Sequence, residues 1–269
     1  MNLSGKHFEY AGKPSTYFGY DFIFAHIESE PLLDLAGKTN LQTTYNQKSK
    51  KRYINNIKYD ESPLSFEHEI ISEDPIDRND LRKIENWLFC QNDFKPLYIA
   101  RNEDVDIQRI NGEFKRIYLN CKFTNASKIE YGDGIHGWKI TVECDSHMAW
   151  QEPITKVVTK FPNGIFKVDV DTDNGDYIYP VVQILTGETG GDISIANQTD
   201  DNLRLMAFEA LPENTEIKLD GEINYVSPSY IDMFTRRNFI RLLPGENIFT
   251  ITGDIASLTL TWQNMRYYT

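Results

Sequence analysis

The chain lacks the features of a membrane protein, a secreted protein and a nucleic-acid-binding protein. None of its 269 residues belongs to an apolar run of the roughly 18 or more residues that a membrane span requires. The segment Met1–His7 has no apolar core typical of a signal peptide, so we expect folding in a reducing cytoplasm. The net charge is −12, which argues against nucleic acid as a partner because phosphate binding needs a basic face.

Cysteine is scarce. The chain has three cysteines, Cys90, Cys121 and Cys144, an odd number at wide spacings. This arrangement fits neither a disulfide framework nor a zinc site. Cys121 and Cys144 lie within apolar runs, and we expect both to be buried as small hydrophobic residues.

Reactive motifs are also missing. The sequence has no G-x-S-x-G nucleophile motif. It has five histidines, none with metal-ligand spacing such as H-E-x-x-H: His7, His26, His68, His136 and His147. We therefore predict no catalytic residue, no metal ligand and no cofactor, which indicates a protein that is not an enzyme.

Two short motifs suggest ligand binding, but their context favours turns. The segment Asp169–Asp173 has the alternating carboxylates of a calcium loop, yet the sixth and twelfth positions are Asn174 and Pro180, where an EF-hand needs glycine and glutamate. A hairpin rim is the preferred interpretation. Gly132–Gly137 matches the dinucleotide motif G-x-G-x-x-G, but a strand, Trp138–Val142, follows where a helix is required. The glycines here favour a turn.

β-strand patterns fill most of the chain. Short alternating runs separated by turn residues recur through 161–269, with no catalytic motif among them. They predict an antiparallel β-sandwich, and so a binding or assembly domain. The predicted strands include Phe18–Phe24, Phe166–Val170, Asp176–Ile184 and Phe239–Leu243, with turns at Asn174–Gly175 and Pro244–Gly245.

One helix is predicted, over residues 77–90. Asp77 or Asn79 is suited to cap it, and Asp80 favours the positive end of its dipole. Its apolar residues recur at helical spacing and form one stripe: Leu81, Ile84, Trp87 and Leu88.

A polar segment, residues 36–52, ends in the basic run Lys48–Arg52 and predicts an exposed arm or a long hairpin. Its basic tip suits an acidic partner surface, and a solvated hairpin tip is the alternative. Near the other end of the chain, Tyr225, Tyr230 and Phe234 lie in a predicted loop. These aromatic residues either stack on sugar rings or pack the sandwich core, and core packing is favoured.

The order of the parts is more specific than any one motif. An aromatic N-terminal segment and the polar arm precede a helix ending in Asn86–Phe89, a strand at Pro96–Ile99, and a strand pair ending near Cys144. The second half contains Asn174–Ile184 and Leu243–Ile251. Over nearly its whole length, the chain resembles the distal tail protein family of bacteriophages with long, non-contractile tails.

The resemblance implies a mainly β fold with one short helix and two domains. Residues 1–152 would form a β-sandwich-like domain that closes into a homohexameric ring, with a belt arm at about 36–56 that clasps the neighbouring subunit. Residues 153–269 would form a galectin-like β-sandwich, and the last strand, 258–269, returns to the first domain in some members. We assign the inter-subunit contact to five residues of the arm: Tyr45, Lys48, Lys50, Lys51 and Arg52.

The resemblance also implies a structural virion protein at the tail tip or baseplate, assembled in the host cytoplasm. Such a ring joins the tail tube protein to a tail-associated fibre or lysin protein, and it carries receptor-binding proteins. The compact second domain has no long insertion that would add a carbohydrate-binding domain. One alternative is a monomeric carbohydrate-binding β-sandwich protein. Another is a glycan-active enzyme, which would need two carboxylates about 5–10 Å apart in a cleft.

Overall fold

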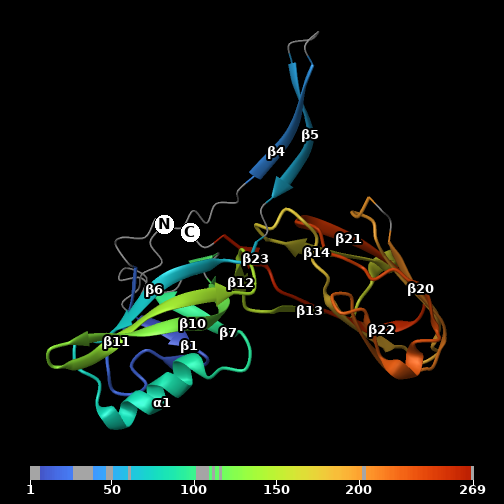
Figure 1. Cartoon of the computed structure of the whole chain (residues 1–269). Coiled ribbons are helices and arrows are strands. Elements are labelled where there is room, and N and C mark those ends of the chain that lie inside the picture. The colour runs from blue at the N-terminus through green and yellow to red at the C-terminus, as the bar shows by residue number, and fades with distance from the viewer. Residues whose placement is uncertain are drawn as a thin grey trace. The chain divides into compact units, whose positions relative to one another are not determined.

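The computed structural model describes residues 7–26, 39–46, 51–59, 62–100, 109–110, 113–114, 117–201 and 204–267 (Figure 1). These residues are mainly β-strand and contain one α-helix, as predicted. The chain divides into two compact units, the first comprising Met1–Trp150 with Tyr267–Thr269, and the second Gln151–Arg266.

The first unit is built on an antiparallel sheet with strand order β2-β1-β7-β10-β11-β6-β3. β12 (Ala149–Gln151) also pairs with β10. The bounds of the other strands are β1 His7–Tyr10, β2 Lys13–Pro14, β3 Ile23–His26, β6 Ser65–Ile71, β7 Lys95–Ala100, β10 Ile117–Tyr131 and β11 Gly134–Cys144. Two short pairs are separate from this sheet: β4 (Thr39–Asn46) with β5 (Lys51–Tyr59), and β8 (Arg109–Ile110) with β9 (Glu113–Phe114).

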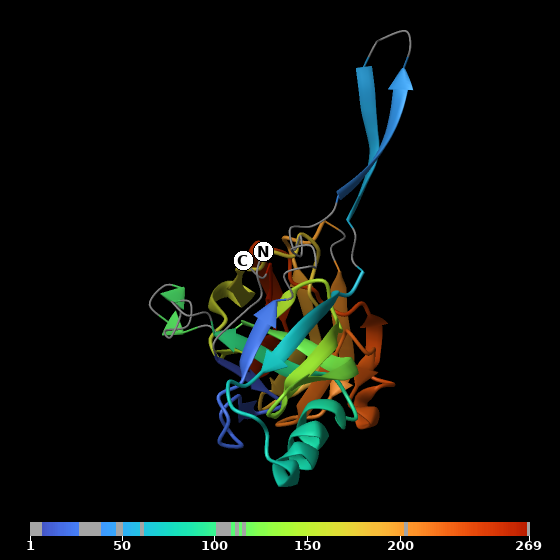
Figure 2. The same ribbon diagram turned by 60° about the vertical axis from the view of Figure 1, so that its left-hand side comes forward.

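Helix α1 (Arg78–Phe89) begins and buries its apolar stripe as predicted. The Asp77 carboxylate accepts a hydrogen bond from the backbone N–H of Asn79 at 2.7 Å. Ile84, Trp87 and Leu88 are buried. The Trp87 indole donates to the carbonyl of Tyr10 at 2.9 Å, which joins the helix to β1. Figure 2 shows α1 beside the sheet from a second direction.

The second unit is a β-sandwich, which confirms the prediction for this part of the chain. One sheet has the order β13-β22-β15-β18-β19, and the other β14-β21-β16-β17-β20. The bounds of the strands are β13 Ile154–Val158, β14 Ile165–Val170, β15 Val181–Thr186, β16 Gly191–Asn197, β17 Leu205–Leu211, β18 Glu216–Asp220, β19 Tyr225–Val226, β20 Phe234–Arg237, β21 Gly245–Thr252 and β22 Ile255–Trp262. Two 3-10 turns (Pro162–Gly164 and Pro228–Tyr230) and a short strand, β23 (Met265–Arg266), complete this unit.

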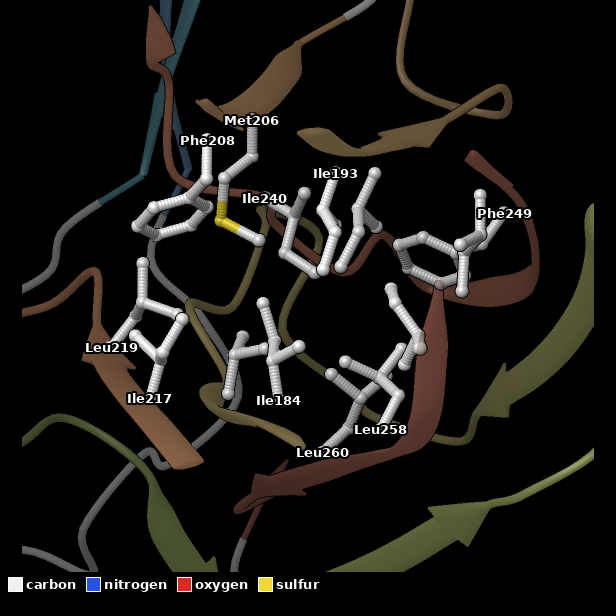
Figure 3. Close-up of a cluster of buried hydrophobic side chains, with 14 of the residues drawn as sticks. Ile184, Ile193, Met206, Phe208, Ile217, Leu219, Ile240, Phe249, Leu258 and Leu260 are labelled. Carbon is white, nitrogen blue, oxygen red and sulfur yellow. The ribbon is translucent and has the colours of Figure 1, made fainter. Parts of the chain in front are cut away.

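Alternating side chains from both sheets form the core of the sandwich (Figure 3). Ile184, Ile217, Leu258 and Leu260 come from one sheet and are fully buried. Phe249, from the other sheet, is also fully buried and stacks on a neighbouring ring. The period-2 burial along each strand is the pattern expected where two sheets pack face to face.

Four predicted elements are wrong in whole or in part. Residues Phe18–Tyr20 form turns and bends, Asp21 and Phe22 lie outside any regular element, and only Ile23 and Phe24 of that predicted strand lie in β3. Gly19, at φ +83°, takes a conformation that an extended strand does not use. The aromatic residues of this loop still serve the core, because Phe22 is fully buried and lies 6.3 Å from the Trp138 ring.

The predicted hairpin at Asn174–Gly175 is also wrong, because β14 and β15 belong to different sheets of the sandwich. β14 pairs with β21, and β15 pairs with β18 and β22. The predicted strand Phe239–Leu243 belongs to no regular strand and forms a single bridge, between Leu242 and Ile178. Of the predicted strand Asp176–Ile184, only Val181–Ile184 lie in β15. Residues Leu258–Trp262 lie in β22, which pairs with β13 and β15 within the second unit.

Candidate inter-subunit arm

The predicted arm contains an antiparallel hairpin, β4 paired with β5. Among the described strands, these two pair only with each other. The segment is rich in threonine, tyrosine and isoleucine, which favour a pleated backbone. Figure 1 shows the two strands as a twisted two-stranded hairpin. The sequence alone left open whether this part of the chain was an irregular arm or a hairpin, and the structure shows a hairpin.

A β-bulge sets which residues of the arm share a face. The register pairs Leu41 with Ile57 and Gln42 with Asn56, and then shifts to pair Thr43 with Ile54. Asn55 is therefore the extra residue on β5. In a regular strand, positions 54 and 57 would fall on opposite faces. The bulge places both isoleucine positions in the row that contains Leu41.

The arm thus has two rows of different character. The first row pairs Thr39 with Tyr59, Leu41 with Ile57, Thr43 with Ile54 and Tyr45 with Arg52. The second row pairs Asn40 with Lys58, Gln42 with Asn56, Thr44 with Tyr53 and Asn46 with Lys51. The first row holds most of the apolar positions. The second row consists mainly of residue types that carry an amide, a hydroxyl or an ammonium group. The composition of the segment predicts only a polar arm, without this division into two rows.

The five residues assigned to the inter-subunit contact all belong to this segment. Tyr45 and Arg52 are opposite each other in the register, and Lys51 is opposite Asn46. Lys48 and Lys50 lie outside the described residues. Residues 39–59 contain five lysine or arginine residues and no aspartate or glutamate. Since the whole chain carries −12, the remainder carries −12 − 5 = −17.

The carboxylates that resemble a calcium loop are held by an arginine. Arg266 lies beside both Asp171 and Asp173, with one guanidinium nitrogen 3.0 Å from Asp173 and 3.2 Å from Asp171. Asp169 lies in β14, opposite Glu246 of β21. Among the described residues, no group of three or more His, Cys, Asp or Glu side chains is placed to hold a metal ion.

In the glycine-rich segment Gly132–Gly137, Gly132 and Asp133 form the turn of the β10–β11 hairpin and Gly134 begins β11, which is the turn preferred over a dinucleotide loop. His136 is buried there between two acceptors, the Ser72 carbonyl at 3.1 Å and the Asp133 carboxylate at 2.9 Å. The hydrogen bond that His136 donates to the Asp133 carboxylate raises the pKa of His136, and the same contact lowers the pKa of Asp133.

The aromatic residues considered for sugar stacking serve mainly the sandwich core. Phe234 is buried and stacks on Phe208 with ring centroids 4.6 Å apart. Tyr230 packs against the same core, and Tyr225 is 39% exposed. A different aromatic contact has no signal in the sequence: the Arg241 guanidinium lies 4.2 Å from the centre of the Tyr177 ring.

Comparison with known families decides the class of this chain. Residues 3–146 match the family model described as a phage tail protein N-terminal domain, and residues 148–262 match the one described as a phage tail C-terminal domain. The chain belongs to this family of phage tail proteins. A comparison with curated proteins finds no significant match.

Solved structures show that this tail protein has a distal tail protein fold. The Dit protein (gp 19.1) of phage SPP1, described as a paradigm of hub adsorption apparatus in phages that infect Gram-positive hosts, aligns with a TM-score of 0.63 at 12% identity. The alignment covers 96% of this chain and 98% of the SPP1 protein. A chain of the phage P2 baseplate in its activated conformation with calcium aligns with a TM-score of 0.52 at 11% identity, over 94% of this chain and 93% of that one.

These comparisons support a β-rich tail protein of the Dit type. In the part of the chain that the structure describes, no helix is long and apolar enough to cross a membrane. The two family models meet between residues 146 and 148, close to the division between the two compact units after Trp150.

Proposed function

We propose that this phage tail protein is a non-enzymatic structural subunit of the tail tip, assembled in the host cytoplasm as a homohexameric ring. In this proposal the ring joins the tail tube protein to a tail-associated fibre or lysin protein and to receptor-binding proteins of the baseplate. The first domain, 1–152, forms the ring, and the second, 153–269, is a galectin-like sandwich. The supporting observation is the match over almost the full length of a hub protein.

The β4–β5 hairpin is the proposed contact between neighbouring subunits. Two features of the arm support this role. Its first row concentrates apolar positions on one face, and such a face is stabilised by burial against another surface. Its five cations oppose the charge of −17 on the rest of the chain, so the arm of one copy is attracted to the acidic surface of another.

The mass of the assembly tests the proposal. Six copies of 31.2 kDa give a particle of about 187 kDa, measured by light scattering after size exclusion, with closed rings in negative-stain images. A stacked pair of rings has twice that mass and also supports the ring. A monomer of 31.2 kDa at every concentration would contradict it, and a glycan array would then test the alternative of a monomeric carbohydrate-binding protein.

Paired variants test the arm separately. Ile54→Thr with Ile57→Thr removes two apolar groups from the first row while keeping β-branched residues in β5. Asn56→Thr, on the second row, is the matched control. We expect the double variant to shift the ring toward free subunits and the control to remain assembled. Equal assembly of both would refute the assignment of the first row as the buried face.

A further inference from the structure

Two cysteines far apart in the sequence face each other in the first unit. The register of β10 and β11 places Cys121 directly opposite Cys144. This pair lies at the open end of the hairpin, whereas Tyr131 and Gly134 are the pair beside the turn. The wide spacing of these cysteines in the sequence does not exclude a disulfide, because an antiparallel hairpin brings its two ends together.

The backbone hydrogen bonds define the type of cross-strand pair. The N–H of Asp145 donates to the carbonyl of Asn120 at 3.0 Å, and the N–H of Cys144 donates away from β10, to Leu64, at 2.8 Å. Cys121 and Cys144 are therefore a non-hydrogen-bonded pair. In such pairs the Cα atoms are about 4.5 Å apart and the side chains are at their closest. This Cα separation lies within the range that a disulfide spans.

Both side chains belong to the core of the first unit. Cys121 is 0% exposed and Cys144 is 5% exposed. Directly opposite residues on paired strands share one face of the sheet, so the two thiols lie on the same side. Both cysteines are free in the structure, and the third one, Cys90, is exposed on the end of α1.

We propose that Cys121 and Cys144 are an oxidation site that closes to a disulfide when the folded protein meets a small peroxide. One thiol sulfur displaces water from hydrogen peroxide and becomes a sulfenic acid, and the second thiol displaces water from that sulfur. The S–S bond replaces two S–H bonds, the peroxide O–O bond is broken, and two water molecules leave. Peroxide takes up the two electrons, so no further reactant is needed.

The surroundings of the pair make this reaction slow and dependent on pH. Burial raises the pKa of both thiols, and the nearby Asp145 carboxylate acts in the same direction. Because the thiolate is the reactive form, the rate should increase with pH. A reducing cytoplasm would keep the pair as thiols, and an oxidising medium would close it.

The expected consequence is a more stable first unit. The disulfide would close a loop of about 24 residues, which constrains the unfolded chain and should raise the melting temperature by about 5–10 °C. It would join the pair of opposite residues of β10 and β11 that lies farthest from their turn.

The test uses the full chain carrying Cys90→Ser, because the exposed Cys90 thiol would itself be oxidised by peroxide. This chain is incubated with hydrogen peroxide at pH 8, unfolded in denaturant and treated with iodoacetamide. We expect no cysteine to be alkylated, and a peptide map to contain the peptides of Cys121 and Cys144 as one cross-linked species. Reduction before alkylation should restore alkylation of both. Alkylation of both after peroxide, or sulfinic acids without a cross-link, would overturn the proposal.

A variant pair extends the test to stability. In a Cys90→Ser background, which removes intermolecular disulfides, peroxide should raise the melting temperature and reductant should reverse the increase. Adding Cys144→Ala should abolish the increase. If that second variant does not fold, the alkylation count on the Cys90→Ser chain still decides the outcome.

Discussion

Removing one partner of the ion pair between Asp200 and Arg241 should strongly destabilise the second unit. Arg241 holds Asp200 through two hydrogen bonds, at 2.6 Å and 2.9 Å, and the Asp200 side chain is only 1% exposed. The Arg241 guanidinium also lies over the Tyr177 ring. The backbone carbonyl of Arg241 accepts a hydrogen bond from the Asn197 side chain. The Asp200 contact raises the pKa of Arg241, so the guanidinium remains charged.

Asp200→Asn keeps the shape of the side chain but removes the charge that compensates the guanidinium. Removing one partner of a buried pair costs about 3–5 kcal/mol, because a charge is left without compensation in a site with little water. For a unit of this size, that loss corresponds to a decrease of roughly 10–20 °C in the melting temperature. Replacing both partners by apolar residues, Asp200→Leu with Arg241→Met, should cost far less or nothing.

Differential scanning calorimetry of the full chain would measure these changes in the transition of the second unit. Lys167→Gln is a matched control, because its ion pair with Glu246 is 58% and 56% exposed and should contribute about 0–1 kcal/mol. The reasoning fails if Asp200→Asn costs less than about 1 kcal/mol, or if the double replacement costs as much as the single one.

Three further changes have defined outcomes. The contact between His136 and Asp133 should stabilise the fold between their two pKa values. It is lost as the pH rises through the raised pKa of His136 and as it falls through the lowered pKa of Asp133, so a His136→Gln variant should have a flatter profile of stability against pH in urea titrations. Asp77→Ala should cost about 1 kcal/mol in chemical denaturation, since it removes the cap of α1. Gly137→Ala should cost about 3 kcal/mol in the same assay, because its Cβ would lie 1.9 Å from the carbonyl oxygen of Ile70 on β6.

The elements that the sequence predicts correctly are those whose caps and apolar patterns involve only residues close together in the chain. The helix at 77–90 was predictable because its cap and its apolar stripe are properties of consecutive turns, and Ile84, Trp87 and Leu88 are buried as expected. The strand Phe166–Val170 was predictable because its apolar and polar residues alternate without a break, and every second residue of β14 is buried. The resemblance in the order of parts added the family, which no single pattern showed.

The missed elements depend on contacts that are distant in the sequence. Asn174–Gly175 has the composition of a hairpin turn, yet the preceding residues Thr172 and Asp173 bond to the backbone of Met265, and the two strands separate into different sheets. The opposition of Cys121 and Cys144 follows from the register of a long hairpin, which depends on both strands together. The bulge at Asn55 likewise requires the pairing of β4 with β5.

The length of the β4–β5 hairpin limits how far one copy can reach. Eight residues in β4 extend about 27 Å at the usual rise of a strand. A compact unit of about 150 residues has a radius of gyration near 15 Å, so its width exceeds this reach. In the proposed ring, each arm would therefore couple adjacent copies only. The last copy to join would gain a contact on both sides at once, so incomplete rings would be scarce beside free subunits and closed hexamers.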